Sequence, residues 1–155
     1  MLLTRRNLLL ACASLPLATP LLAHAQADRR IHVLKDPNCE CCTGWVSHLQ
    51  GAGFKVTMEE IHAGLLAVRK GELGVPIDLQ SCHTGEAGGY VLEGHVPAAD
   101  IERLLTECPD ALGLAVPGMP YGSPGMGPET ERDAYEVILF RRDGTTQVWT
   151  AYEEA

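Results

Sequence analysis

The sequence predicts an α/β protein whose elements follow the order β-α-β-α-β-β-α and continue into a β-hairpin. Two observations indicate this class. Short β-favouring runs alternate along the chain with segments whose apolar residues recur at helical spacing. Three cysteines, Cys39, Cys41 and Cys42, lie where the first such run gives way to the first helical segment. Thiols at the start of a helix favour soft-metal or redox chemistry, because the unpaired N–H groups there stabilise thiolates.

The first half of the chain supplies two strands and two helices. Ile31–Leu34 is β-favouring, and the turn signal Asp36–Asn38 ends it. Apolar residues at helical spacing predict a helix over Cys42–Gln50, closed by glycines. Alternating apolar residues predict a second strand over Phe54–Ile61, and a short helix is expected over Ala63–Lys70.

The third and fourth strands are expected over Val75–Leu79 and Tyr90–Glu93, with a glycine-rich turn, Gly85–Gly89, before the fourth. The helix Ala98–Glu107 completes this part of the chain. The order is typical of a thioredoxin-like core. The C-x-x-C pair at the first helix agrees with it, as does Pro76, which opens the third strand where that fold places a cis proline.

After this core the chain changes character. Residues Gly113–Pro128 hold five glycines and four prolines and are expected to form a loop. Tyr135–Phe140 and Thr145–Tyr152 then read as two strands joined across Arg142–Gly144, a strong hairpin signal.

Residues 1–27 read as a secretory signal peptide, with Arg5-Arg6 before an apolar run and small residues at its end. The arginine pair fits a twin-arginine signal and a general secretory signal about equally. The segment is too short, and too broken by Pro16 and Pro20, to span a membrane. We therefore expect an exported protein with one mature domain, residues 28–155, and no membrane span.

Charge and cysteine content narrow the function. Without Arg5 and Arg6 the chain carries 10 basic against 20 acidic residues, a net charge of −10 with histidine neutral. Nucleic acid and anionic membrane surfaces are therefore poor partners.

Five cysteines remain in the mature part, and an odd number with two adjacent argues against purely structural pairing. One or two ordinary disulfides remain the alternative.

The glycine- and proline-rich loop contains Met119 and Met126. Thioether sulfur is a soft ligand suited to Cu(I), and it needs no deprotonation. Cys82 and His83 are expected at the end of the third strand, close to the cysteine cluster. Thiolate and imidazole suit copper or zinc, and the methionines favour copper over zinc.

At these residues the chain resembles the CopG-type proteins, a family long described as a domain of unknown function or as predicted metal-binding proteins. The similar motifs extend from about Val33 to Met126 and cover most of the mature chain. They are C-E-C-C-T-G-W (39–45), H-L (48–49), G-F (53–54), G-V-P (74–76), S-C-H-T (81–84), E-G-H-V-P-A (93–98), G-L-A-V-P-G-M-P (113–120) and G-S-P-G-M (122–126).

The resemblance implies a thioredoxin-like protein in the periplasm of Gram-negative bacteria, with a role in copper resistance. It also implies bound copper, either as a single site or as a multinuclear cluster. The implied ligands are four cysteines, and the implied auxiliary residues are a histidine and two methionines: Cys39, Cys41, Cys42, Cys82, His83, Met119 and Met126.

Four further residues are not expected to be metal ligands. Glu40 stands where the family commonly has glycine and adds a charge beside the thiolates. Cys108 belongs to no motif and is expected as a half-buried free thiol, with an intermolecular disulfide as the alternative. His95 is expected to be a hydrogen-bonded structural histidine, with ligation the less favoured reading. Trp45 is expected in the core.

The leading hypothesis is a periplasmic copper protein that binds Cu(I) through thiolates and thioethers, with Cu(I)/Cu(II) cycling as an extension. A thiol-disulfide oxidoreductase is the alternative, with Cys39 as nucleophile and Cys42 resolving the mixed disulfide. Cys41 argues against it, because a third thiol inside the motif would compete for that mixed disulfide. A third hypothesis is a passive copper chaperone that serves an efflux system.

Overall fold

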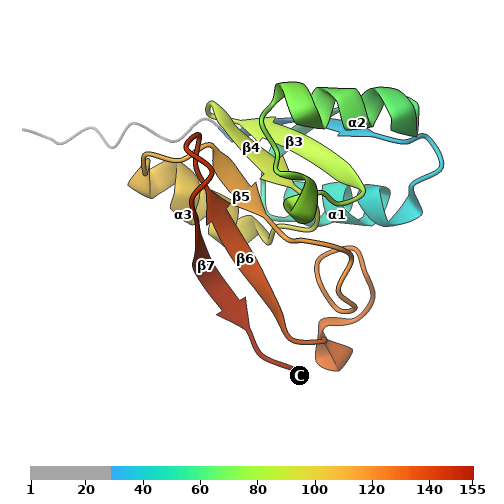
Figure 1. Ribbon diagram of the computed structural model, residues 1–155. Helices are drawn as coiled ribbons and strands as arrows, with labels where there is room; N and C mark the ends of the chain where they lie inside the picture. The colour runs from blue at the N-terminus through green and yellow to red at the C-terminus, as the bar shows by residue number, and fades with distance from the viewer. Residues whose placement is uncertain (1–28) are drawn as a thin grey trace, which may run out of the picture.

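The computed structural model describes residues 29–155, so the signal peptide predicted over residues 1–27 lies outside the described part of the chain. Seven strands form one mixed sheet in the order β2-β1-β3-β4-β5-β6-β7, accompanied by three α-helices (Figure 1). The elements are β1 (Arg30–Lys35), α1 (Glu40–Gly51), β2 (Lys55–Glu60), α2 (Ala63–Glu72), the 3-10 helix η1 (Ile77–Leu79), β3 (His83–Ala87), β4 (Tyr90–Glu93), α3 (Ala98–Glu107), β5 (Gly113–Ala115), the 3-10 helix η2 (Glu129–Glu131), β6 (Tyr135–Phe140) and β7 (Thr146–Tyr152).

The sheet mixes parallel and antiparallel pairs, and the predicted α/β class is confirmed. Strand β1 is parallel to β2 and antiparallel to β3, and β4 is parallel to β5. The other neighbours, β3–β4, β5–β6 and β6–β7, are antiparallel. The predicted C-terminal hairpin is present as β6 and β7.

Apolar side chains cover both faces of the sheet. On one face, Trp45 and Leu49 of α1 and Ile101 of α3 belong to a single buried cluster with strand residues such as Leu92. On the other face, a smaller cluster includes Val75 and other residues near η1. Alternation along each strand separates the two clusters, since successive side chains point to opposite faces. Trp45 is therefore a core residue, as predicted, and its indole N–H donates to the Val96 carbonyl at 2.8 Å.

The predicted third strand is wrong. Val75–Leu79 does not join the sheet, and its second half forms η1. The strand beside β1 is instead β3, whose sequence His-Thr-Gly-Glu-Ala lacks the apolar alternation of a typical strand. Four of its five residues are nevertheless buried, because neighbouring side chains satisfy or cover them. No peptide bond among residues 29–155 is cis, so Pro76 follows a trans bond.

The predicted loop Gly113–Pro128 is also wrong at its start, where Gly113–Ala115 forms β5, an inner strand of the sheet between β4 and β6. Glycine is required at its first position. A Cβ on Gly113 would lie 1.9 Å from the Val91 carbonyl oxygen of β4, so only glycine allows this close approach. The strand has only three residues and begins with glycine, so its sequence resembles that of the glycine- and proline-rich loop that follows it.

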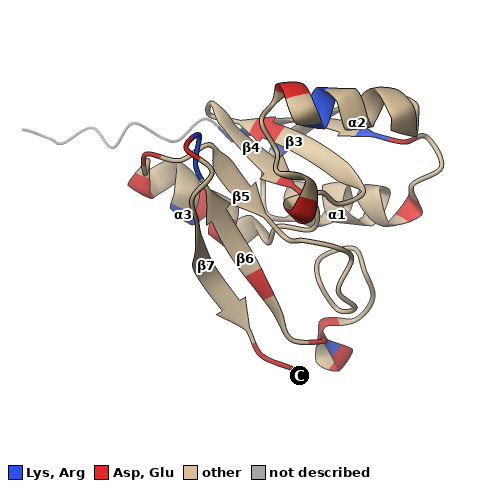
Figure 2. Cartoon of the chain, viewed as in Figure 1, with Lys and Arg blue, Asp and Glu red and all other residues tan. Residues whose placement is uncertain are grey.

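No helix within residues 29–155 has the length and apolar character needed to cross a membrane. Acidic residues are spread along the chain over helices, turns and the C-terminal hairpin, and the Lys and Arg residues are likewise scattered as short separate segments (Figure 2).

Cys108 ends α3 in an unusual conformation. Its φ of 47° makes it the one described non-glycine residue in the left-handed region, and its thiol is free and exposed rather than half-buried as predicted. Glycine is the residue that helices commonly use at such a terminal position, because it has no Cβ to clash there.

Replacing Cys108 by glycine is expected to stabilise the protein by about 1 kcal/mol, because it relieves this conformation. The measurement is the free energy of urea unfolding under reducing conditions. Cys108→Ala is the matched control, since it removes the thiol but keeps the Cβ. Equal stability changes in both variants would show that the thiol, not the backbone, matters.

His48 of α1 supplies an acceptor to the start of α3. Its Nε2 accepts the backbone N–H of Ala98 at 3.1 Å, which requires the neutral ring. Burial against α3 lowers the pKa of His48 below its usual 6.5. The residue therefore contributes stability that is complete above pH 6.5 and is lost as the pH falls through the lowered folded-state pKa.

Stability is accordingly expected to fall as the pH drops below about 6.5, the usual pKa of histidine. In His48→Gln, whose amide oxygen accepts the same N–H without titrating, the fall is expected to be shallower. Urea unfolding at a series of pH values measures both slopes. Parallel curves for the two proteins would contradict the role of His48.

Candidate metal centre

The cysteine cluster lies where β1 ends and α1 begins. Cys39 is the N-cap of α1, and Cys41 and Cys42 lie in its first turn, so α1 begins two residues before the predicted Cys42. Asp36 fixes this turn: its carboxylate accepts the N–H groups of Asn38 at 2.9 Å and Ala63 at 3.2 Å. The hydrogen bond from Asn38 is the main cause of the lowered pKa of Asp36.

Four cysteine sulfurs converge at this point from two segments. Cys39 and Cys42 are joined by a disulfide, with their Cα atoms 5.4 Å apart. The Cys41 sulfur lies 3.5 Å from that of Cys39 and 3.8 Å from that of Cys82. The Cys82 sulfur also lies 3.6 Å from that of Cys42. All four lie within 4.8 Å of one another, so these four cysteines form a group able to hold a metal once the disulfide is reduced.

A second donor group shares Cys82. Its sulfur lies 3.2 Å from Nδ1 of His83 and 3.2 Å from Nε2 of His95. The other nitrogen of His95, Nδ1, donates to the Pro124 carbonyl at 2.8 Å, so Nε2 carries the free lone pair of a neutral ring. A carbonyl that orients a histidine in this way is typical of metal-binding histidines.

Burial keeps both imidazoles neutral, the form that binds metals. It lowers the pKa of His83 well below the usual value, and the positive charge of Lys70 acts in the same direction. Burial likewise lowers the pKa of His95. Among the described buried side chains, His83 Nε2 is one of two nitrogens without a hydrogen-bond partner. Burial, followed by the Cys41 thiol, raises the pKa of Cys82 to about 12, so its sulfur stays protonated without a cation.

The loop that holds Met119 and Met126, called the methionine loop below, lies directly against α1. Gly125 has a φ of 88°, and a Cβ on it would lie 2.5 Å from the Trp45 nitrogen and 2.7 Å from the Cys41 carbonyl oxygen. Only glycine permits this contact. Met126 follows it and is partly exposed, whereas Met119 is 55 % exposed. The loop thus reaches the cysteine turn through its backbone.

A buried ion pair supports the segment that carries Cys82. The Glu93 carboxylate accepts hydrogen bonds from the Lys70 ammonium, from the Thr84 hydroxyl at 2.6 Å and from the Ser81 N–H at 2.6 Å. Lys70 also donates to Thr84 Oγ1 at 2.8 Å. Both charged side chains are almost fully buried, so each depends on the other for its solvation.

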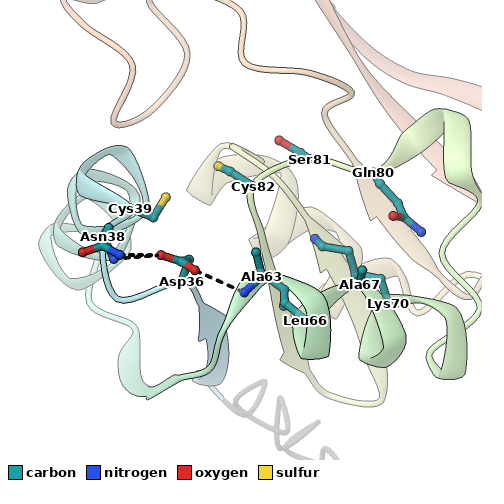
Figure 3. A pocket seen from close by; sticks show the side chains of 10 residues that line it. All are labelled: Asp36, Asn38, Cys39, Ala63, Leu66, Ala67, Lys70, Gln80, Ser81 and Cys82. Carbon is teal, nitrogen blue, oxygen red and sulfur yellow. Dashed lines mark hydrogen bonds between the residues drawn. The ribbon is translucent and has the colours of Figure 1, made fainter.

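A pocket of about 390 Å³ opens beside the cluster, between the turn before α1, helix α2 and the segment 80–82 (Figure 3). Cys39 and Cys82 lie at one side of it, and Ala63 and Ala67 of α2 form part of another wall.

The mixed α/β fold and these donors define a thiol-rich site of the kind that binds soft metals. A family model described as "Protein of unknown function, DUF411" matches residues 79–126. Two solved structures, "Copper resistance protein copG- Form 1" and "Form 2", are 49 % and 48 % identical. They cover 80 % and 79 % of this chain and 97 % of their own, with TM-scores of 0.74 and 0.73. No curated protein gives a significant match. The chain belongs to the CopG-type copper-resistance family.

The structure brings together most of the residues that the sequence singled out. Cys39, Cys41, Cys42 and Cys82 converge, and His83 contacts Cys82. His95 is buried and hydrogen-bonded to the Pro124 carbonyl, as expected, and its Nε2 in addition faces the Cys82 sulfur. The available signal was its position at the end of β4, which pairs with the strand that follows Cys82.

Removing the cation from the buried pair is expected to destabilise the protein strongly. Lys70→Met leaves the Glu93 carboxylate buried without its counterion, at a cost of about 3–5 kcal/mol in the free energy of unfolding. Lys70→Met/Glu93→Gln is expected to recover part of this loss, because it removes the unpaired charge.

Arg69→Ala is the matched control, since it breaks the neighbouring but exposed pair with Glu72 and is expected to change stability little. Denaturant unfolding of all four proteins measures the effect. A small loss in Lys70→Met, similar to that of the control, would contradict the dependence of each buried charge on the other.

Proposed function

We propose that this protein binds Cu(I) in the periplasm as part of copper resistance, with Cys39, Cys41, Cys42 and Cys82 as thiolate ligands. The observation that carries the proposal is the convergence of these four sulfurs within 4.8 Å of one another. Thiolate is a soft donor suited to Cu(I). The copper-resistance names of two relatives that are nearly half identical support copper over zinc.

His83, Met119 and Met126 are the proposed auxiliary ligands, and His95 joins them because its Nε2 faces the Cys82 sulfur. Four thiolates in one place favour a multinuclear cluster, since a thiolate sulfur can bridge two ions. Cycling between Cu(I) and Cu(II) is a further part of the proposal, supported by the imidazole donors beside the thiolates. Each thiol loses its proton on binding, so affinity decreases as the pH falls.

The export signal over residues 1–27 and a single mature domain, 28–155, belong to the same proposal. A thioredoxin-like core is supported by the strand order β2-β1-β3-β4 and by the antiparallel pairing of β3 with both neighbours.

A thiol-disulfide oxidoreductase is the second candidate, and the Cys39–Cys42 disulfide favours it. In that function Cys39 and Cys42 exchange electrons with a partner and copper is incidental. Cys41 distinguishes the two candidates, because copper binding uses its sulfur and disulfide exchange does not.

The test is the copper content of residues 28–155, reduced and loaded anaerobically with Cu(I). More than one copper per chain is expected in the parent protein, and a clearly lower number in Cys41→Ser. Cys108→Ser is the matched control and is expected to keep the full number, because its thiol is exposed at the end of α3.

Retention of copper should also protect the cluster thiols from alkylation. Absence of bound copper in the parent, together with normal disulfide exchange in Cys41→Ser, would reject copper binding and favour the oxidoreductase.

A further inference from the structure

The Cys39–Cys42 disulfide must be opened before the four cysteines can act as ligands. Two of the four sulfurs are bonded to each other, and a bonded sulfur is not a thiolate. Opening the bond takes two electrons and yields two thiols. Any copper binding through all four cysteines therefore depends on a reductant that reaches this bond.

The two sulfurs of the disulfide differ in access. Cys42 is fully buried, with 0 % of its surface exposed, behind the first turn of α1. Cys39 is partly exposed and lines the pocket beside α2. Since thiol–disulfide exchange requires approach to the attacked sulfur, an incoming thiolate meets Cys39 and not Cys42.

The pocket has the size and lining of a site for a small molecule. Its volume of about 390 Å³ lies in the range typical of small-ligand pockets. Ala63, Leu66 and Ala67 give it an apolar wall, and polar groups of Asp36 and Gln80 lie among its other lining residues. Figure 3 shows the Cys39 side chain directed toward the Cys82 side of this space.

The helix favours the departure of Cys42. Cys42 lies in the first turn of α1, and Cys39, the N-cap, makes no side-chain hydrogen bond to the free N–H groups of that turn. Unpaired N–H groups and the positive end of the helix dipole stabilise a thiolate there.

We propose that this pocket binds a low-molecular-weight thiol that reduces the disulfide by attack on Cys39. The thiolate forms a bond to Cys39 Sγ, and the Cys39–Cys42 bond breaks with its electron pair on Cys42 Sγ, which takes up a proton. A second thiolate then attacks the sulfur of the bound small molecule and releases Cys39. Two small thiols are oxidised to one disulfide, and two protein thiols are formed. The purpose of this step rests on the proposed function, but the reduction itself involves no metal.

The first experiment measures how fast N-acetylcysteine amide reduces the disulfide in a Cys108→Ser background, by acid quenching, alkylation and mass spectrometry. Ala67→Phe fills the pocket and is expected to slow reduction about tenfold, which corresponds to about 1.4 kcal/mol of activation free energy. Val68→Phe is the matched control, because Val68 is exposed on the same helix and does not line the pocket. It is expected to leave the rate unchanged. An unaltered rate in Ala67→Phe, or equal slowing in both variants, overturns the proposal.

A second experiment tests which sulfur is attacked. The oxidised form of the same thiol is added to reduced Cys42→Ser/Cys108→Ser protein, and the mixed disulfide is located by peptide mass. Labelling of Cys39 supports the proposal, whereas labelling mainly of Cys41 or Cys82 overturns it. A cysteine-containing extended peptide that reduces the parent protein much faster than N-acetylcysteine amide overturns the small-molecule identity of the reductant.

The copper count of the parent protein, reduced beforehand with borohydride, separates this proposal from the proposed function. Failure to bind copper there rejects the proposed function and leaves the reduction kinetics to be judged alone. Full copper binding with no effect of Ala67→Phe on reduction rejects only the pocket.

Discussion

The antiparallel pairing of β1 with β3 determines where the chemistry of this protein lies. Because the two strands run in opposite directions, the end of β1 lies beside the start of β3, and Lys35 pairs with His83. Cys39 follows β1 and Cys82 directly precedes β3, so two sulfurs 43 positions apart along the chain come together. The contacts of the Cys82 sulfur with those of Cys41 and Cys42 depend on this register. A shift by one residue would turn His83 to the other face of the sheet.

The same register obliges the protein to bury polar groups, and most of them have a compensating partner, although His83 Nε2 has none. Thr84 is hydrogen-bonded by Lys70 of α2 and by Glu93 of the neighbouring strand β4. Gly85 faces α1, where it leaves room for the Trp45 ring, 3.2 Å from where a Cβ would lie. Glu93 of the ion pair also accepts the backbone N–H of Ser81, which directly precedes Cys82. The pair thereby fixes the backbone on the N-terminal side of Cys82. Packing and polar contacts together position the sulfur from both sides.

The sequence predicted those elements whose burial is apolar and periodic. Helix α3 has the predicted bounds, because its apolar residues recur on one face. Strand β3 was missed, because three of its four buried residues are a histidine, a threonine and a glycine whose partners are distant in sequence. The cysteine cluster was predicted from spacing and family motifs alone. The contact of His95 with Cys82 depends on the β3–β4 register and on Pro124, which local sequence does not encode.

Gly44 and Gly125 face each other at the contact between α1 and the methionine loop. A Cβ on Gly44 would lie 3.0 Å from the Gly125 Cα, and a Cβ on Gly125 would lie 2.9 Å from the Gly44 carbonyl carbon. The two positions therefore behave as one unit in protein engineering. A library that varies the loop to change metal preference must keep both glycines fixed, since a side chain at either would lift the loop from the cysteine turn. Diversity belongs at the outward-facing position Met119, where added volume meets solvent.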